Sequence, residues 1–181
     1  MGGAFGGKEV LNIQAHLALV ALEARARLIH YDGRREMPVA AFIMGAGRTQ
    51  RRAGELIACF VIPAKCLGQP QAFTKVGPRR VQAISKLSLA TVRVPDDPAG
   101  ISFAFGAVGP VPMTCPQAHH SLASGAQDKA HLNSVAELAM SEIMPIDDMR
   151  STAAYRRRVT GNLLMRHGWA FFSHATCRGD G

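Results

Sequence analysis

The chain has 181 residues, of which 48% are hydrophobic, 6% aromatic and 19% charged, and its formal net charge is +8. This composition predicts one globular domain, or one domain with a fragment, and excludes global disorder. No uncharged apolar run approaches the roughly 20 residues of a membrane span, and dispersed arginines with few aromatic residues predict no nucleic-acid binding.

The first predicted element is a helix at residues 10–28, VLNIQAHLALVALEARARL, which contains no glycine or proline. Its centre is apolar almost all round, so we expect it to be deeply buried. The sequence Tyr31-Asp32-Gly33 then predicts a turn between the segments ARLIH and REMPVAAF. These segments have the pattern of a β-hairpin, and Pro38 marks the end of its second arm.

The middle of the chain predicts strands. Residues 54–63, GELIACFVIP, form an apolar run of strand length, and the Gly/Pro/Gln-rich connector at 64–71 predicts a subdomain boundary. Residues 85–94 and 101–108 alternate in polarity on either side of a turn at 95–100. They predict an antiparallel hairpin with one buried face.

The last third of the chain predicts a loop followed by helices. Residues 109–116 contain three prolines and are extended, whereas 131–142 carry apolar residues at helical spacing. A final helix is expected from about Ser151, because the aspartates at 147–148 suit its positive N-terminus. Its predicted buried stripe consists of Tyr155, Val159 and Leu163. The arginines at 156–158 lie mostly off this stripe, so we expect them to face solvent.

The order of these elements predicts the fold class. Strands come first, helices come last, and no βαβ alternation is present. The sequence therefore predicts an α+β fold with a small antiparallel sheet and helices packed on one face.

The cysteines and histidines predict neither a disulfide framework nor a metal site. The four cysteines form no C-x-x-C motif and are too few for a disulfide-rich scaffold. With no export signal expected, we interpret them as free thiols of a cytoplasmic protein. The seven histidines are scattered, so no metal ligand set is expected.

The chain opens with MGGAFGGKE, in which Gly2 to Lys8 matches the phosphate-loop pattern G-x-x-x-x-G-K. That loop needs a Ser or Thr hydroxyl next, to hold Mg²⁺, and a buried strand before it. Glu9 occupies the hydroxyl position and we expect no preceding strand. A working phosphate loop is therefore not predicted.

The same stretch, GGAFGGKE followed by VLNIQAHLALVAL, resembles the glycine loop of the molybdopterin-binding subunit in the xanthine dehydrogenase and aldehyde oxidase family. The resemblance implies that Gly6 and Gly7 let the backbone approach the molybdenum centre. It makes Phe5 the loop aromatic and Glu9 the acid that contacts substrate. The remaining molybdenum scaffold of that family is absent, so we interpret the loop as vestigial. The alternative is a diverged FAD-binding loop, which would occupy the same place.

The rest of the chain resembles the FAD-binding flavoprotein subunit of the same molybdenum hydroxylases, which include CO dehydrogenase. Residues 18–63 are similar to the end of its FAD-binding domain, and FTKVGPRRVQAISKLSLATVRV at 73–94 is similar to the opening of its C-terminal domain. AFGAVGPVPMTCPQA at 104–118 and PIDDMRSTAAYRRRVTGNLL at 145–164 match its later signatures. The resemblance implies a C-terminal domain of the CO dehydrogenase flavoprotein type, preceded by a remnant of the FAD-binding domain.

The resemblance also implies a layout in four parts. They are 1–17, a molybdopterin-subunit-like loop remnant; 18–64, the end of the FAD-binding domain; 65–169, the C-terminal domain; and 170–181, a tail without periodic signal.

The function implied by the resemblance is that of a truncated, FAD-binding electron-transfer component of a molybdenum hydroxylase. FAD is the implied cofactor, and molybdopterin and iron–sulfur centres belong to partner subunits of the same complex. We expect no catalytic side chain, because the flavin carries the electrons. We also expect the isolated chain to be inactive. The alternative is a non-catalytic docking module that no longer binds FAD, in which the helix at 10–28 exposes an apolar patch.

Four cations are the candidate cofactor-binding residues, namely Lys75, Arg79, Arg80 and Lys86. In the family this region approaches the flavin edge, so the resemblance implies that they steady an anionic reduced flavin or meet its adenine end. The alternative is a structural cluster that bonds carbonyl groups and the turn at 147–148. Arg48 and Thr49 are interpreted as loop packing.

Overall fold

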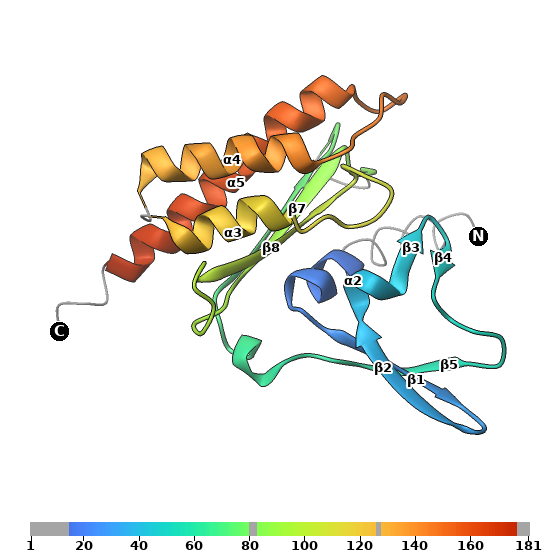
Figure 1. Ribbon diagram of the computed structural model, residues 1–181. Coiled ribbons are helices and arrows are strands. Elements are labelled where there is room, and N and C mark those ends of the chain that lie inside the picture. The colour runs from blue at the N-terminus through green and yellow to red at the C-terminus, as the bar shows by residue number, and fades with distance from the viewer. Residues whose placement is uncertain (1–14, 80–82, 126–127, 177–181) are drawn as a thin grey trace.

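The computed structural model describes residues 15–79, 83–125 and 128–176, arranged in two halves (Figure 1). The N-terminal half opens with helical residues 15–21. It continues with β1 (Arg25–His30), β2 (Gly33–Pro38), α2 (Val39–Phe42), β3 (Ile43–Gly45), β4 (Arg48–Thr49), β5 (Leu56–Val61) and the 3-10 helix η1 (Ala64–Cys66). The C-terminal half consists of β6 (Gln71–Val76), β7 (Leu87–Arg93), β8 (Ile101–Gly106), α3 (Pro116–Ser124), α4 (Lys129–Glu142) and α5 (Ala153–Thr176).

The strands form antiparallel sheets, as predicted for an α+β fold. The order of one sheet is β2-β1-β5, that of another is β6-β7-β8, and β3 pairs with β4. The hairpin around Tyr31 and Asp32 is confirmed, since His30 pairs with Gly33 and the second arm ends at Pro38. The strand predicted at 54–63 is β5, and the later hairpin is β7–β8.

The predicted helix at 10–28 is wrong in its C-terminal part. The described helix ends at Ala21, where the Glu23 N–H donates to Val20 O and the Ala24 N–H donates to Leu19 O. Glu23 has a φ of 54°, so these bonds form a Schellman-type cap without the usual glycine. The chain then enters β1, whose pairing with β2 and β5 overrides local helix propensity.

The β6–β8 sheet is covered on both faces, so the prediction of one buried face is also wrong. All six residues of β8 and six of the seven in β7 are buried. One face, with Leu89 and Phe103, packs in a core against α3, α4 and α5. On the other face, Ala90 and Ala104 belong to a second core with Leu17 of the N-terminal helix. The described part of that helix is therefore covered and exposes no apolar patch.

The buried stripe of α5 differs from the predicted one. Tyr155 is 40% exposed, whereas Arg156, which we expected to face solvent, is 4% exposed. Arg156 is held by Asp148, with Nη2 2.7 Å from Oδ2, and its Nη1 donates to Ala107 O. Val159 and Leu163 do pack in the core, as predicted, so the prediction is wrong only for Tyr155 and Arg156. The helix continues to Thr176.

The other helices are α3, which the sequence did not predict, and α4, which it did. The apolar side chains at helical spacing in α4 are all buried, namely Leu132, Val135, Ala136 and Ala139. α3 begins with Pro116 at its first turn, a position that tolerates proline because its N–H has no intrahelical partner. The three prolines of 109–116 therefore mark a loop and the start of a helix.

Cys59, Cys66 and Cys115 are free thiols, as predicted. In the part of the chain that the structure describes, no group of three or more acidic, histidine or cysteine residues is placed to hold a metal ion. None of the helices within the same ranges is long and apolar enough to cross a membrane.

Candidate functional site

A groove of about 470 Å³ lies between the N-terminal helix and the β6–β7 strands. Its lining consists of Ala15, Ala18 and Leu22 from the helical segment and Gln71, Ala72, Phe73, Ala90, Thr91 and Val92 from the strands. Most of these side chains are small or apolar. Such a lining suits the apolar part of a ligand.

Phe73 supplies the aromatic surface of this groove. It lies on β6, an edge strand, and pairs with Ala90, which belongs to the core shared with the N-terminal helix. The neighbouring Thr74 points the other way and bonds His167 of α5. Alternation along the strand therefore turns Phe73 toward the groove, where its side chain is still 42% exposed.

Lys75 and Lys86 lie at the same end of the β6–β7 pair, because Val76 is paired with Leu87. Lys75 shares the strand face of Phe73, and its Nζ donates to Ala83 O at 3.2 Å. The Nζ of Lys86 lies 5.2 Å from the ring centroid of Tyr155. The sequence placed both cations in one region, and the structure brings them to one end of the groove-forming strands.

The other predicted cofactor residues are less well placed or lie elsewhere. Arg79 is exposed on the segment that follows β6. Arg80, Phe5, Gly6, Gly7 and Glu9 lie outside the described residues. The structural alternative agrees with the bond from Lys75 to a carbonyl group. Asp148, however, forms ion pairs with Arg150 and Arg156.

His167 is a residue of this region that the sequence did not single out. Its Nε2 lies 2.8 Å from Thr74 Oγ1 and its Nδ1 lies 2.9 Å from Thr91 Oγ1. Burial lowers the pKa of the imidazole, and the charge of Arg166 lowers it further. His167 is therefore a neutral bridge behind the groove, linking α5 to both strands. No local pattern signals it, because its partners are distant in sequence.

A larger cavity of about 570 Å³ is lined by Glu23, Asp97 and His119 among others. Its carboxylates already have partners. Glu23 pairs with Lys65 at 2.9 Å, and Asp97 accepts the N–H of Ala99 at 2.8 Å. Among the described residues, no lysine or arginine lines this cavity, so its lining offers a phosphate group no permanent positive charge.

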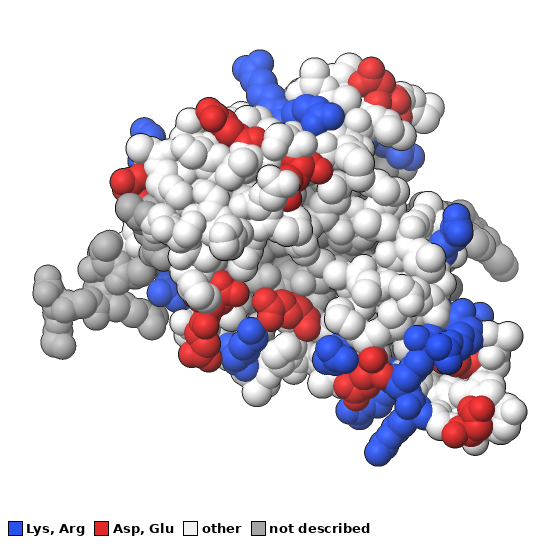
Figure 2. Space-filling model, viewed as in Figure 1, with Lys and Arg blue, Asp and Glu red and all other residues white. Residues whose placement is uncertain are grey.

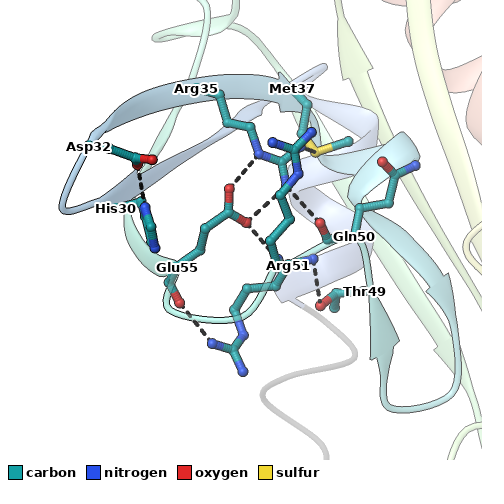
Figure 3. Close-up of polar contacts among 9 residues, drawn as sticks. His30, Asp32, Arg35, Met37, Thr49, Gln50, Arg51 and Glu55 are labelled. Carbon is teal, nitrogen blue, oxygen red and sulfur yellow. Dashed lines mark hydrogen bonds and ion pairs between the residues drawn. The ribbon is translucent and has the colours of Figure 1, made fainter.

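A dense polar cluster joins β2 to the loop before β5 (Figure 3). Arg35 donates from Nε and Nη2 to the two carboxylate oxygens of Glu55 at 2.7 and 2.9 Å, and the Arg52 N–H adds a third bond at 2.6 Å. The Arg35 guanidinium is the main cause that lowers the pKa of Glu55 to about 2. Thr49 accepts the Arg51 N–H, in agreement with loop packing.

Solved structures of known enzymes share this fold. Carbon monoxide dehydrogenase from Hydrogenophaga pseudoflava, in a form lacking the Mo-pyranopterin moiety, matches with a TM-score of 0.76 and 24% identity over 86% of this chain and 56% of that one. The reconstituted CO dehydrogenase from Oligotropha carboxidovorans gives a TM-score of 0.72 and 26% identity over 82% and 52%. Quinoline 2-oxidoreductase from Pseudomonas putida 86 gives 0.68 and 21% over 83% and 53%.

The chain thus spans about half the length of these solved relatives. No curated protein matches it. The family model of the CO dehydrogenase flavoprotein C-terminal domain matches residues 72–168, which include most of β6, all of β7 and β8, and most of α5. As the sequence resemblance predicted, the chain belongs to the family of the CO dehydrogenase flavoprotein C-terminal domain.

Proposed function

We propose that the chain is an FAD-binding electron-transfer component of a molybdenum hydroxylase, and that the groove beside Phe73 holds the flavin ring. The partly exposed Phe73 side chain in an apolar groove carries this proposal. The groove has a volume of about 470 Å³, within the range of about 300–1,000 Å³ for small-molecule sites. Membership of a flavoprotein family adds support.

The residues present fit such a group. An aromatic ring left uncovered at the groove offers a stacking surface for a planar heterocycle. Among the described residues, the Nζ of Lys75, on the same strand face, donates to Ala83 O, and its positive charge can attract a negatively charged ring or phosphate. Bound FAD would supply the electron-transfer chemistry, and these side chains would bind and orient it.

The proposed partners are the molybdopterin-binding and iron–sulfur subunits of the same kind of complex. One structural relative is a CO dehydrogenase whose molybdenum cofactor lacks its Mo-pyranopterin moiety. Because this chain covers about half of each relative, the activity of the whole complex is proposed and not assigned to the isolated chain.

A fluorescence titration with FAD tests the flavin site. Phe73→Ala should weaken FAD binding about three- to ten-fold, because it removes one stacking contact. Phe60→Ala is the matched control, since Phe60 is also exposed, at 39%, but lies on β5. Equal losses in both variants, or no binding of FAD by the wild-type chain, would contradict the groove as the flavin site.

A second candidate function is the docking module without FAD. The apolar patch that the sequence predicted on the N-terminal helix does not support this function, because the described residues Leu17, Val20 and Ala21 are buried. The exposed apolar side chains of β5 now favour it instead. Co-purification of the chain with molybdenum or iron–sulfur subunits, without flavin absorbance, would support this function, and a chain that retains no subunit would oppose it.

A further inference from the structure

β5 is an edge strand with an uncharged, apolar sequence, LIACFV. In the sheet of described strands it pairs with β1 and with no other strand. Five consecutive residues, Leu56–Phe60, are exposed, although alternate side chains of a strand point to opposite faces. Both faces of β5 are therefore exposed, and within the described residues one of its edges is unpaired.

The exposed apolar surface is concentrated on this strand and the residue after it. Leu56 is 65% exposed, Ile57 is 43% exposed, Phe60 is 39% exposed and Ile62 is 37% exposed. Natural edge strands are protected by lysine, proline or a bulge. β5 itself contains neither lysine nor proline, and its register shift lies on the side that faces β1. Among the strands that the structure describes, none pairs with the outer edge of β5, which leaves its backbone groups available for pairing.

A positively charged face adjoins this edge. Arg25 is paired with Val61 and Arg27 with Cys59, so both arginines share a sheet face with residues of β5. The two guanidinium groups share one carboxylate, that of Glu36, at 3.6 and 2.5 Å. One positive charge is left over. On the face drawn in Figure 2, Lys and Arg side chains gather over the N-terminal half of the molecule, with Asp and Glu side chains among them.

We propose that the edge of β5 is a docking site for an extended segment of a partner protein whose apolar and acidic side chains alternate. The segment adds a strand, so its backbone bonds the free edge and its apolar side chains cover those of β5. Its acidic side chains face Arg25 and Arg27. A second copy of this chain is a poorer occupant, because two chains of net charge +8 repel each other. This surface is separate from the proposed flavin groove.

Peptide binding to the full 181-residue chain tests the proposal. The probes are two fluorescently labelled seven-residue peptides, one in which valine alternates with glutamate and one in which valine alternates with lysine. Fluorescence anisotropy measures the binding of each peptide. The glutamate peptide should bind and the lysine peptide should not. In the double variant Arg25→Gln/Arg27→Gln, affinity for the glutamate peptide should fall about five- to thirty-fold. Arg48→Gln, an exposed arginine on β4, is the control and should keep the wild-type affinity.

Hydrogen exchange separates strand addition from simple charge attraction. Amide exchange of β5 should slow when the glutamate peptide is bound, while that of β2, the opposite edge of the same sheet, should not change. Slowing on β2 instead of β5, equal loss in the Arg48 variant, or no peptide binding would overturn the proposal. β5 amides that are already protected in the free chain, with self-association on sedimentation, would assign the edge to a second copy and also overturn it.

Discussion

At the scale of single residues, His167 shows how a buried imidazole makes stability depend on pH. Burial lowers its pKa below the ordinary 6.5, so the unfolded chain takes up a proton at higher pH than the folded chain does. The free energy of unfolding is therefore larger above about pH 6.5 and decreases as the pH falls through the folded-state pKa. Protonation would also remove the acceptor that one threonine hydroxyl needs.

We predict that His167→Gln removes this contribution to the pH dependence. The variant should lose about 1–3 kcal/mol at pH 7, because a buried bridge is disturbed. Its free energy of unfolding should then change less than that of the wild type between about pH 7 and pH 5. Urea unfolding at each pH measures both effects. His120→Gln is the control, since His120 is exposed and should keep the wild-type slope.

The backbone conformation of Glu23 lowers the stability of the folded chain. A φ of 54° is unfavourable for a side chain with a Cβ. The ion pair with Lys65 offsets little, because both side chains are more than a third exposed. Glu23→Gln should lose only the ion pair, whereas Glu23→Gly should lose the pair and the backbone strain. We predict that the Gly variant is more stable than the Gln variant by about 1 kcal/mol, measured by thermal unfolding. A Gly variant less stable than the Gln variant would contradict this.

At the scale of elements, α4 and α5 approach closely because glycines line their contact. A Cβ at Gly168 would lie 2.7 Å from Cδ1 of Leu132, and a Cβ at Gly161 would lie 2.8 Å from Sδ of Met140. Leu132 is 1% exposed and enclosed, whereas Met140 is only partly buried and its unbranched side chain can move. An added Cβ could therefore be accommodated at Gly161 by movement of Met140, whereas Leu132 cannot move away from Gly168.

We predict opposite effects for the two alanine substitutions. Gly161→Ala should be neutral or stabilising by up to about 1 kcal/mol, because alanine has the higher helix propensity. Gly168→Ala should destabilise by about 1–2 kcal/mol, because overpacking against Leu132 exceeds that gain. Denaturant unfolding measures both. A stabilised Gly168→Ala chain would show that the α4–α5 contact can open without cost.

At the scale of the whole molecule, the β6–β8 sheet lies between two hydrophobic cores, and each of its faces belongs to one of them. Its helical side packs with α3, α4 and α5, and its other side packs with the N-terminal helix and β1. The proposed flavin groove lies along this second contact, where Phe73 remains uncovered. The proposed docking edge lies on β5, in the other sheet. Flavin binding and partner docking therefore use different elements and can be tested independently.

The sequence alone determined the elements whose signals are local. The β1–β2 hairpin follows from Tyr31-Asp32-Gly33 between two short arms, and α4 follows from apolar residues at helical spacing. The α+β class follows from element order, and the family resemblance follows from quoted segments that overlap residues 72–168. These features depend on turn chemistry and side-chain period, which neighbouring residues specify.

Only the tertiary structure decided the rest. It ended the N-terminal helix at Ala21 and made the following residues a strand, because β2 and β5 offered pairing that local propensity does not encode. It buried Arg156 against Asp148 and joined His167 to Thr74 and Thr91. It also formed the groove beside Phe73. Each of these depends on residues far apart in the chain, whose contacts exist only after the sheets and helices have packed.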